Sequence, residues 1–145
     1  MNRFGDDNMG RFSVDLELAN NNDIARAEAG DIPANKVRRL GLRGVMDSGA
    51  TRLVIPESVA QQLGLQIAGQ VGVRYADGRT TQRSIAGGIH LTWGGRSSVF
   101  NAIIEPERES ASIGAIVLED LDLLVDCAAQ ALRPRDPRWI ISEVE

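Results

Sequence analysis

Apolar and polar residues alternate along several short stretches of the chain, a pattern typical of β-strands that bury one face. The clearest example begins at Phe12, where Phe12, Val14, Leu16 and Leu18 are separated by single polar residues. The same period, or a short apolar run, predicts further strands over residues 37–46, 53–55, 71–75, 80–85, 89–93, 99–104, 123–125 and 131–133. A weaker pattern predicts one more strand over 24–29, after a turn at 20–23.

Turn and helix signals separate these strands. Pro56 suits the start of a short helix, because its missing N–H leaves no hydrogen bond unmade there, and Gly64 suits the end of that helix. The pair Asp77-Gly78 predicts a hairpin turn, and a second short helix is predicted over 117–121. Many short strands with one or two short helices predict an all-β fold, closed or sandwiched, since a parallel α/β fold would need more helix.

The composition narrows the class of protein. The chain has 145 residues, of which 43% are hydrophobic and 25% charged, as in an ordinary globular domain. We expect one domain over 11–145, preceded by a flexible polar tail over 1–10 that does not resemble a signal peptide. The protein is therefore expected to be cytoplasmic. A net charge of −4 argues against nucleic-acid partners, and no apolar run is long enough to span a membrane.

Metal and disulfide chemistry find little support in the sequence. Cys127 is the single cysteine and His90 the single histidine, which excludes an internal disulfide, a thiolate cluster and a multi-histidine site built from one chain. No metal or organic cofactor is implied. We expect His90 on the solvent side of a strand, the charged stretch 105–109 as a solvated connection, and Asp120, Asp122 and Asp126 in helix-end and turn roles.

One short stretch carries candidate chemistry. An apolar strand leads to Asp47, followed by Ser48, Gly49 and Ala50. Glycine after Ser48 allows a close backbone approach or positive φ, and the Ser48 hydroxyl can form a local hydrogen bond. Taken alone, these residues fit an Asp that caps its own turn as well as they fit a catalytic carboxylate.

What surrounds this stretch favours the second interpretation. Asp-Ser-Gly between apolar residues resembles the active-site loop of aspartic peptidases, and the order downstream is similar to the single-domain, retropepsin-like peptidases of retroviral type and their bacterial relatives. That order consists of the apolar run 53–55, a helix ending at Leu63-Gly64, a hairpin at 76–78, the segment 113–115 and the run 123–126. The resemblance covers residues 12–135 and implies a closed acid-protease β-barrel.

The resemblance also implies roles for individual residues. Asp47 looks like the catalytic aspartate, with Ser48, Gly49 and Ala50 completing the active-site loop. Ser48 stands where threonine is more usual and would hydrogen-bond across a dimer beneath the two aspartates. The resemblance implies that a flap covers the substrate and that its tip consists of Tyr75, Ala76, Asp77 and Gly78, reaching to Arg79. It also implies that the active-site loop is supported by the segment Ile113, Gly114 and Ala115. Asp77 could favour basic substrates, but its turn role is preferred.

A single chain cannot supply the chemistry that this family performs. Peptide hydrolysis by carboxylates needs one acid and one base on the same water and carbonyl, and the sequence contains no second Asp-Ser/Thr-Gly. The second aspartate must then be Asp47 of another subunit, on the axis of a two-fold homodimer. We expect an aspartic endopeptidase with an acidic optimum, because one aspartate must stay protonated. The alternatives are a catalytically idle dimer that binds peptides or scaffolds a partner, and a monomeric structural domain.

Overall fold

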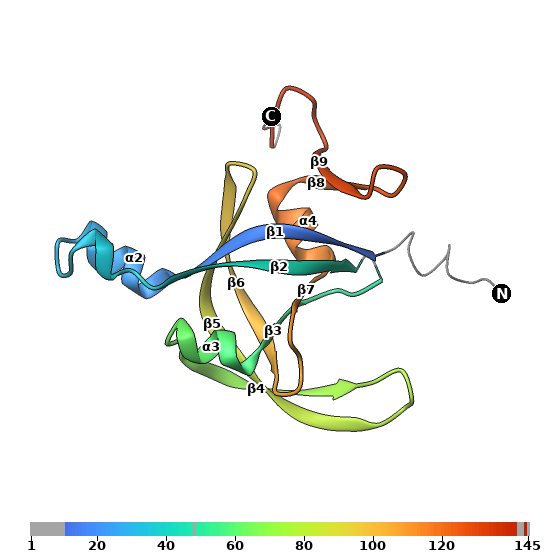
Figure 1. Cartoon of the computed structure of the whole chain (residues 1–145), viewed down its shortest axis with the longest axis horizontal. Coiled ribbons are helices and arrows are strands. Elements are labelled where there is room, and N and C mark those ends of the chain that lie inside the picture. Colours follow the sequence, from blue (N-terminus) through green and yellow to red (C-terminus); the bar gives the residue numbers. More distant parts are fainter. Residues whose placement is uncertain (1–10, 48, 142–143, 145) are drawn as a thin grey trace.

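The described part of the chain folds into a closed barrel (Figure 1). The structure is a computed structural model and describes residues 11–47, 49–141 and 144, so the tail predicted over 1–10 lies outside the described residues. The strands are β1 (Arg11–Asn20), β2 (Arg39–Asp47), β3 (Leu53–Pro56), β4 (Ile67–Arg74), β5 (Thr80–Trp93), β6 (Arg96–Glu105), β7 (Ala111–Ile113), β8 (Leu123–Asp126) and β9 (Ala131–Pro134). The helical elements are α2 (Asn21–Glu28), η1 (Ala34–Lys36), α3 (Glu57–Gln62) and α4 (Ala115–Leu121).

Closure of the barrel follows from the strand order. The main sheet runs β1-β2-β7-β3-β6-β5-β4, and β1 also pairs with β5, so that six strands close on themselves while β4 extends from β5. Strands β8 and β9 form a separate hairpin. The all-β, closed-barrel prediction is therefore confirmed. A barrel removes free edges from most of its strands and places every second side chain inside.

The alternation in β1 is the pattern that builds the inside of the barrel. Phe12, Val14, Leu16 and Leu18 are all buried, and β1 pairs with β2 in antiparallel register from Arg11↔Asp47 to Ala19↔Arg39. Strand β2 runs parallel to β7, and β3 parallel to β6. The register places the end of β2 beside the start of β1, which positions the candidate site at the rim of the barrel.

Strand β5 is longer than the sequence predicts. The two strands predicted over 80–85 and 89–93 are one strand, interrupted by an irregularity between Ala86 and Ile89. Gly88 lies within it at φ +68°, a conformation that glycine adopts without steric cost. The bend lets the first half of β5 pair with β4 and the second half with β1, and this second pairing closes the barrel.

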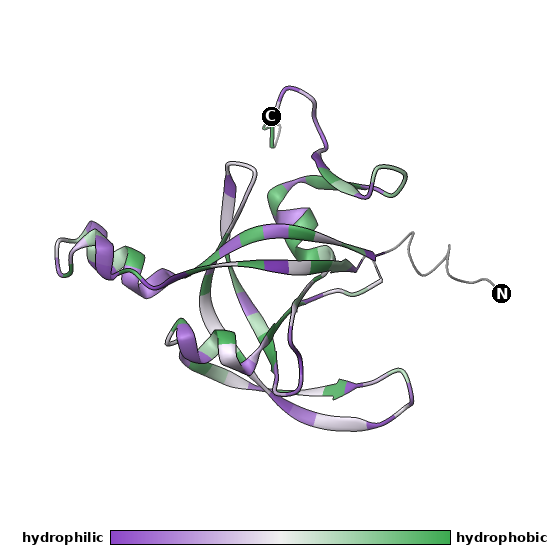
Figure 2. Ribbon diagram, viewed as in Figure 1, coloured by the Kyte–Doolittle hydropathy of each residue, from purple (hydrophilic) through white to green (hydrophobic). Residues whose placement is uncertain are grey.

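The strand predicted over 24–29 is wrong, because this segment is the helix α2. The Asn20 side chain accepts a hydrogen bond from the backbone N–H of Asp23 at 3.1 Å, which caps the helix. The segment projects from the barrel between β1 and β2 (Figure 1), and Figure 2 colours much of it as hydrophilic. Alternating alanines gave a weak strand-like pattern, but a polar segment away from the sheet has no strand to pair with.

The described residues form neither a membrane-spanning helix nor a metal-binding cluster. None of the helices they form is both long and apolar enough to cross a membrane. Within the same residues, no group of three or more His, Cys, Asp or Glu side chains is arranged to hold a metal ion. Cys127 is exposed in the turn between β8 and β9.

Candidate active site

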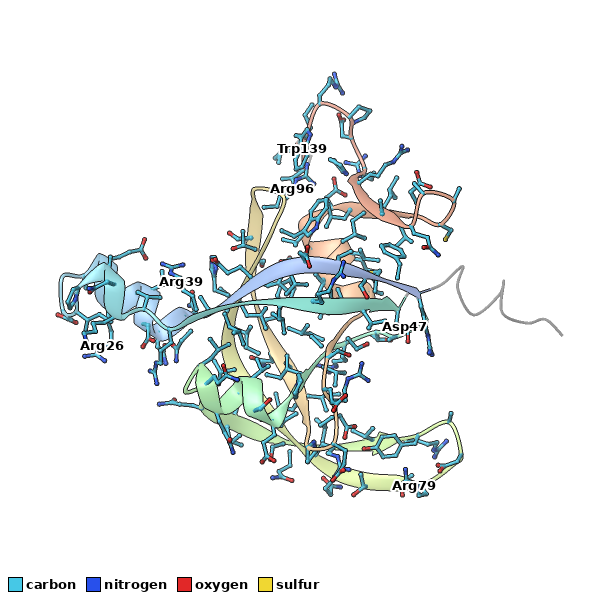
Figure 3. All side chains as sticks on the ribbon, viewed as in Figure 1. Arg26, Arg39, Asp47, Arg79, Arg96 and Trp139 are labelled. Atoms are coloured by element: carbon cyan, nitrogen blue, oxygen red, sulfur yellow. The ribbon has the colours of Figure 1, made fainter. Side chains whose placement is uncertain are left out.

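Asp47 is the last residue of β2 and lies at the rim of the barrel (Figure 3). Its carboxylate Oδ1 accepts a hydrogen bond from the backbone N–H of Gly49 at 3.1 Å. Its Oδ2 lies 3.6 Å from the guanidinium of Arg11, the residue opposite it on β1. The side chain keeps 26% of its surface exposed, so this carboxylate is oriented by the chain and remains accessible from outside. Ser48 lies outside the described residues.

The loop after Asp47 is held by backbone hydrogen bonds from a distant part of the chain. The N–H of Ala115 donates to the carbonyl of Ala50, and the N–H of Ile116 donates to that of Thr51, both at 2.9 Å. The N–H of Ala50 in turn donates to the carbonyl of Asp47 at 3.0 Å. The structure thus brings the predicted segment 113–115 against the predicted active-site loop.

Gly114 makes this contact possible. A Cβ built on Gly114 would lie 2.5 Å from the carbonyl carbon of Thr51 and 2.6 Å from the backbone N and O of Arg52. Real Cβ atoms do not approach backbone so closely, so any other residue would push the two segments apart. Gly49 differs, because among the described residues its Cβ would meet Asp47 Oδ1 alone, at an ordinary 3.5 Å.

The predicted flap is the hairpin between β4 and β5. Its turn is closed by the N–H of Tyr75 donating to the carbonyl of Arg79 at 2.8 Å and by Gly78 at φ +87°. Asp77 accepts hydrogen bonds from the backbone N–H and the Nε of Arg79, which hold the pKa of its carboxyl below the usual value. Asp77 therefore has the preferred turn role. Ala76 is exposed at the tip.

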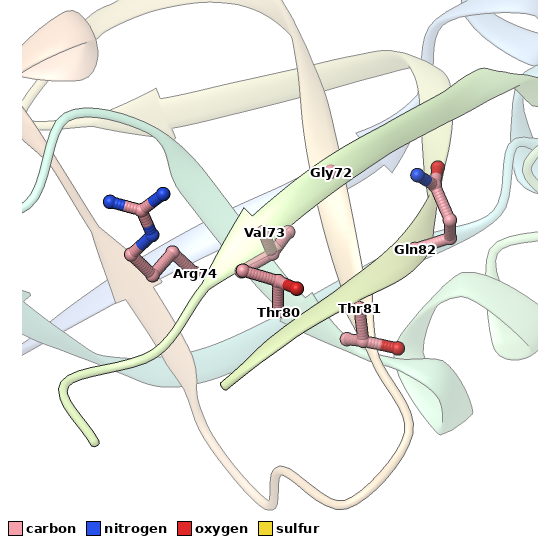
Figure 4. A pocket seen from close by; sticks show the side chains of 6 residues that line it. All are labelled: Gly72, Val73, Arg74, Thr80, Thr81 and Gln82. Atoms are coloured by element: carbon pink, nitrogen blue, oxygen red, sulfur yellow. The ribbon is translucent and has the colours of Figure 1, made fainter. Parts of the chain in front are cut away.

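The hairpin carries a shallow hollow of its own. A space of about 530 Å³ is lined by Gly72, Val73, Arg74, Thr80, Thr81 and Gln82, all on β4 and β5 (Figure 4). Asp47 and Arg79 lie on the same side of the barrel in the view of Figure 3. None of the residues lining the hollow belongs to the Asp47 loop, so this hollow does not by itself join the flap to the carboxylate.

Comparison with known protein families decides the class of this chain. The model of the aspartyl protease family matches residues 35–125, which is more than half of the chain and includes the Asp47 loop and the flap hairpin. The chain belongs to the aspartyl protease family.

The chain also resembles solved structures of retroviral proteases in fold. The chain superposes on the EIAV protease in complex with the inhibitor HBY-793 with a TM-score of 0.54 and 14% identity, over 77% of this chain and 88% of that protein. The simian foamy virus (mac) protease matches with a TM-score of 0.43 and 17% identity, over 54% of this chain and 80% of the viral one. No curated protein sequence matches the chain. The recognition of a retropepsin-like fold is confirmed.

Sequence reasoning missed one cluster in this aspartyl protease. Glu105, predicted to lie in a solvated connection, is the last residue of β6, and its side chain is only 14% exposed. It accepts hydrogen bonds from the Tyr75 hydroxyl at 2.7 Å and from Arg83 Nε at 2.8 Å. Nothing local in the sequence indicates this contact, because Tyr75 and Glu105 are 30 residues apart.

The remaining titratable candidates have structural roles. His90 lies on β5 between β1 and β6 and alternates with the buried Ile89 and Leu91, so it is on the outer side of the strand as predicted. It is half-buried there, and its Nδ1 has no hydrogen-bond partner among the described residues. The helix-end and turn predictions hold for two aspartates. Asp122 ends α4 at φ 57°, and Asp126 accepts a hydrogen bond from the N–H of Ala129 at 3.0 Å.

Proposed function

We propose that this chain is an aspartic endopeptidase that hydrolyses peptide bonds with a water activated by two Asp47 carboxylates, one from each subunit of a homodimer. The observation that carries the proposal is the position of Asp47. Asp47 is held on its own loop by a hydrogen bond from Gly49, the loop is held by backbone hydrogen bonds from 115–116, and 26% of the Asp47 side chain stays exposed. Family membership supports the same reading.

The chemistry follows from two carboxylates that share one proton. The ionised Asp47 takes a proton from the water as its oxygen attacks the peptide carbonyl carbon, while the protonated Asp47 donates to the carbonyl oxygen. Collapse of the tetrahedral intermediate breaks the C–N bond. The leaving nitrogen takes the proton held by one Asp47, and a hydroxyl of the intermediate returns its proton to the other Asp47 as the carbonyl re-forms. The products are a carboxylic acid and an amine, and the dyad again holds one proton.

Substrate would bind as an extended strand. The flap hairpin, Tyr75 to Gly78, would cover the peptide and exclude bulk water, while backbone groups of the cleft add strand-like hydrogen bonds. Ile113, Gly114 and Ala115 act here as the support of the catalytic loop, and Ser48 as the hydroxyl that bonds across the dimer axis. Arg11, 3.6 Å from Asp47, would offset part of the repulsion between two carboxylates that meet at this axis.

The test is cleavage of a diverse peptide mixture between about pH 4 and pH 7, where carboxylate dyads of this kind are active. Asp47→Asn keeps the size of the side chain but cannot act as a base, so we expect turnover to vanish with the fold intact. Asp15→Asn on β1 is the matched control, because Asp15 is exposed and forms an ion pair at the surface with Arg43. Peptide binding without cleavage by the wild type would instead indicate the idle binding dimer, and equal cleavage by wild type and Asp47→Asn would refute the proposal.

A further inference from the structure

The tip of the flap hairpin is fastened to the barrel through one phenol. The hydroxyl of Tyr75 donates to the carboxylate of Glu105, with oxygen–oxygen distances of 2.7 Å to Oε2 and 2.9 Å to Oε1. Arg83 Nε donates to Glu105 Oε1 at 2.8 Å and to the Tyr75 oxygen at 3.0 Å. The three polar groups therefore satisfy one another in a closed triangle.

The three residues come from separate parts of the fold. Tyr75 follows β4 at the turn, Arg83 lies on β5, and Glu105 ends β6. The ion pair is shielded, with 25% of the Arg83 side chain and 14% of the Glu105 side chain exposed. Charged hydrogen bonds that are removed from water in this way are stronger than those at the surface. The triangle therefore ties the hairpin tip to the barrel wall.

The ring of Tyr75 is held as well as its hydroxyl. The guanidinium of Arg79 lies 4.8 Å from the ring centroid and that of Arg83 lies 5.9 Å from it, distances at which a cation is attracted to an aromatic face. These residues border a hollow of about 280 Å³, which is completed by Glu107 and Arg108. Both ends of the tyrosine side chain are thus fixed.

We propose that Tyr75, Arg83 and Glu105, which we call the latch, hold the flap hairpin in the position over the peptide cleft that substrate binding requires. Tyr75 and Glu105 are then positioning residues for catalysis. The role of the flap rests on the proposed peptidase function. The fastening of the hairpin itself does not, because it is a property of the free protein.

The latch makes a specific kinetic prediction. When the flap is in the position that binds substrate in only a fraction of molecules, the apparent dissociation constant rises by the inverse of that fraction. The complex, once formed, reacts as before. Loss of a shielded, charge-assisted hydrogen bond is enough to lower this fraction about tenfold. We therefore expect latch variants to raise KM about tenfold and to leave kcat within about twofold, a split that general destabilisation would not produce.

The free protein offers a second measurement, because Tyr75 is the only tyrosine in the chain. The hydrogen bond to the Glu105 carboxylate raises the pKa of Tyr75, since the phenolate would face an anion. Glu105→Gln removes that anion and should lower the pKa of the phenol, an effect visible in the ultraviolet absorbance of the phenolate. An unchanged titration would mean that Tyr75 and Glu105 are not in contact in solution.

The deciding experiment is hydrogen exchange of the hairpin amides in Tyr75→Phe and Glu105→Gln, with Glu17→Gln as control. Glu17 forms an exposed pair with Arg39, and its partner on β5 is Thr92, at the end of that strand opposite the turn of the flap hairpin. Amides at 75–80 should exchange about tenfold faster in both latch variants and at the wild-type rate in the control. Tyr75→Phe keeps the ring and its cation contacts, so it is expected to fold.

Two results would overturn the latch. Unchanged exchange at 75–80 in both variants would show that the hairpin tip is not held by this triangle. Faster exchange with unchanged KM would show that the triangle holds the tip but does not position it for substrate. If the wild type cleaves no peptide at all, the proposed function fails, while exchange and phenol titration still decide whether the hairpin is fastened.

Discussion

Gly114 illustrates how a single residue determines the geometry of the candidate site. The backbone of residues 114–116 and that of residues 50–52 touch without an intervening side chain, and two hydrogen bonds link them. The loop cannot retreat from an added methyl group, because Ala50 is also bonded to the carbonyl of Asp47. The position of Asp47 therefore depends on the absence of a Cβ atom at Gly114, a residue far along the chain from it.

We predict that Gly114→Ala lowers the free energy of unfolding by about 1–3 kcal/mol, the usual cost of overpacking a closely packed site. Peptidase activity should fall by more than this loss of stability accounts for, because the Asp47 loop itself must shift. Chemical denaturation followed by circular dichroism measures the first effect, and turnover of folded protein measures the second.

Gly41→Ala is the matched control for this substitution. Gly41 lies on β2, the same strand that carries Asp47, and a Cβ built on it meets no atom of the described part of the chain within 4 Å. Its variant should retain both stability and turnover. Equal behaviour of the two alanine variants would contradict the close-contact explanation.

At the scale of elements, the helix α2 is held to the barrel by a partly buried ion pair. Asp23 accepts hydrogen bonds from Arg38 Nε at 2.8 Å, from Arg38 Nη2 at 3.0 Å and from the Arg38 backbone N–H at 3.0 Å. The Asn20 side chain, which caps the helix, also donates to the carbonyl of Leu63 at 2.8 Å, just after α3. Polar contacts, rather than apolar packing, thus set the direction of this insertion.

We predict a loss of stability at acidic pH that depends on Asp23. The hydrogen bonds from Arg38 lower the pKa of its carboxyl from 3.8 to about 2. A carboxyl whose pKa is lower in the folded state contributes stability that is complete above about pH 4 and disappears as pH falls toward about 2. With Arg38 half exposed, the contribution is about 1–2 kcal/mol. Urea unfolding at a series of pH values would measure it.

Asp23→Asn separates this effect from general acid unfolding. The variant should be less stable near neutral pH and should lose the part of the pH dependence between about 4 and 2. Asp15→Asn, whose side chain is 82% exposed in its pair with Arg43, should keep the wild-type profile. If the free energy of unfolding fell with the same slope in this pH range for wild type and Asp23→Asn, the role of the Asp23–Arg38 pair would be refuted.

On the scale of the whole molecule, the barrel presents one Asp47 at its rim, and the proposed chemistry needs two. A homodimer with its axis at Asp47 completes the site without adding any residue to the chain. Activity in such a system belongs to a pair of subunits, so it must depend on protein concentration wherever the dimer dissociates.

We predict that mixing wild-type protein with an equal amount of Asp47→Asn protein lowers the turnover per wild-type subunit by about half once subunits have exchanged, since random pairing gives half of them an inactive partner. Dilution should lower the specific activity of the wild type over the range in which sedimentation detects dissociation. An inert protein at the same concentration serves as the control. Constant turnover in both experiments, with a monomer in sedimentation, would contradict the shared site.

Local sequence determined much of this fold. Alternation over 12–18 predicted β1 and its buried face, because side chains in a strand point to opposite sides at every step. Asp77-Gly78 predicted the hairpin turn, and Gly64, at φ +62°, the end of α3, because few residues adopt these backbone angles. The motif at 47–50, taken together with the order of elements downstream of it, predicted the aspartyl protease family.

Tertiary structure decided what local sequence could not. The segment 24–29 is a helix because it has no strand beside it, and 80–93 is a single strand because its two halves find different partners across a bend. Glu105 is shielded only because the fold brings β6 to the flap, and Gly114 is crowded only because α4 begins against the Asp47 loop. Periodicity reports the face of a residue, whereas its neighbours depend on contacts between distant segments that no local pattern encodes.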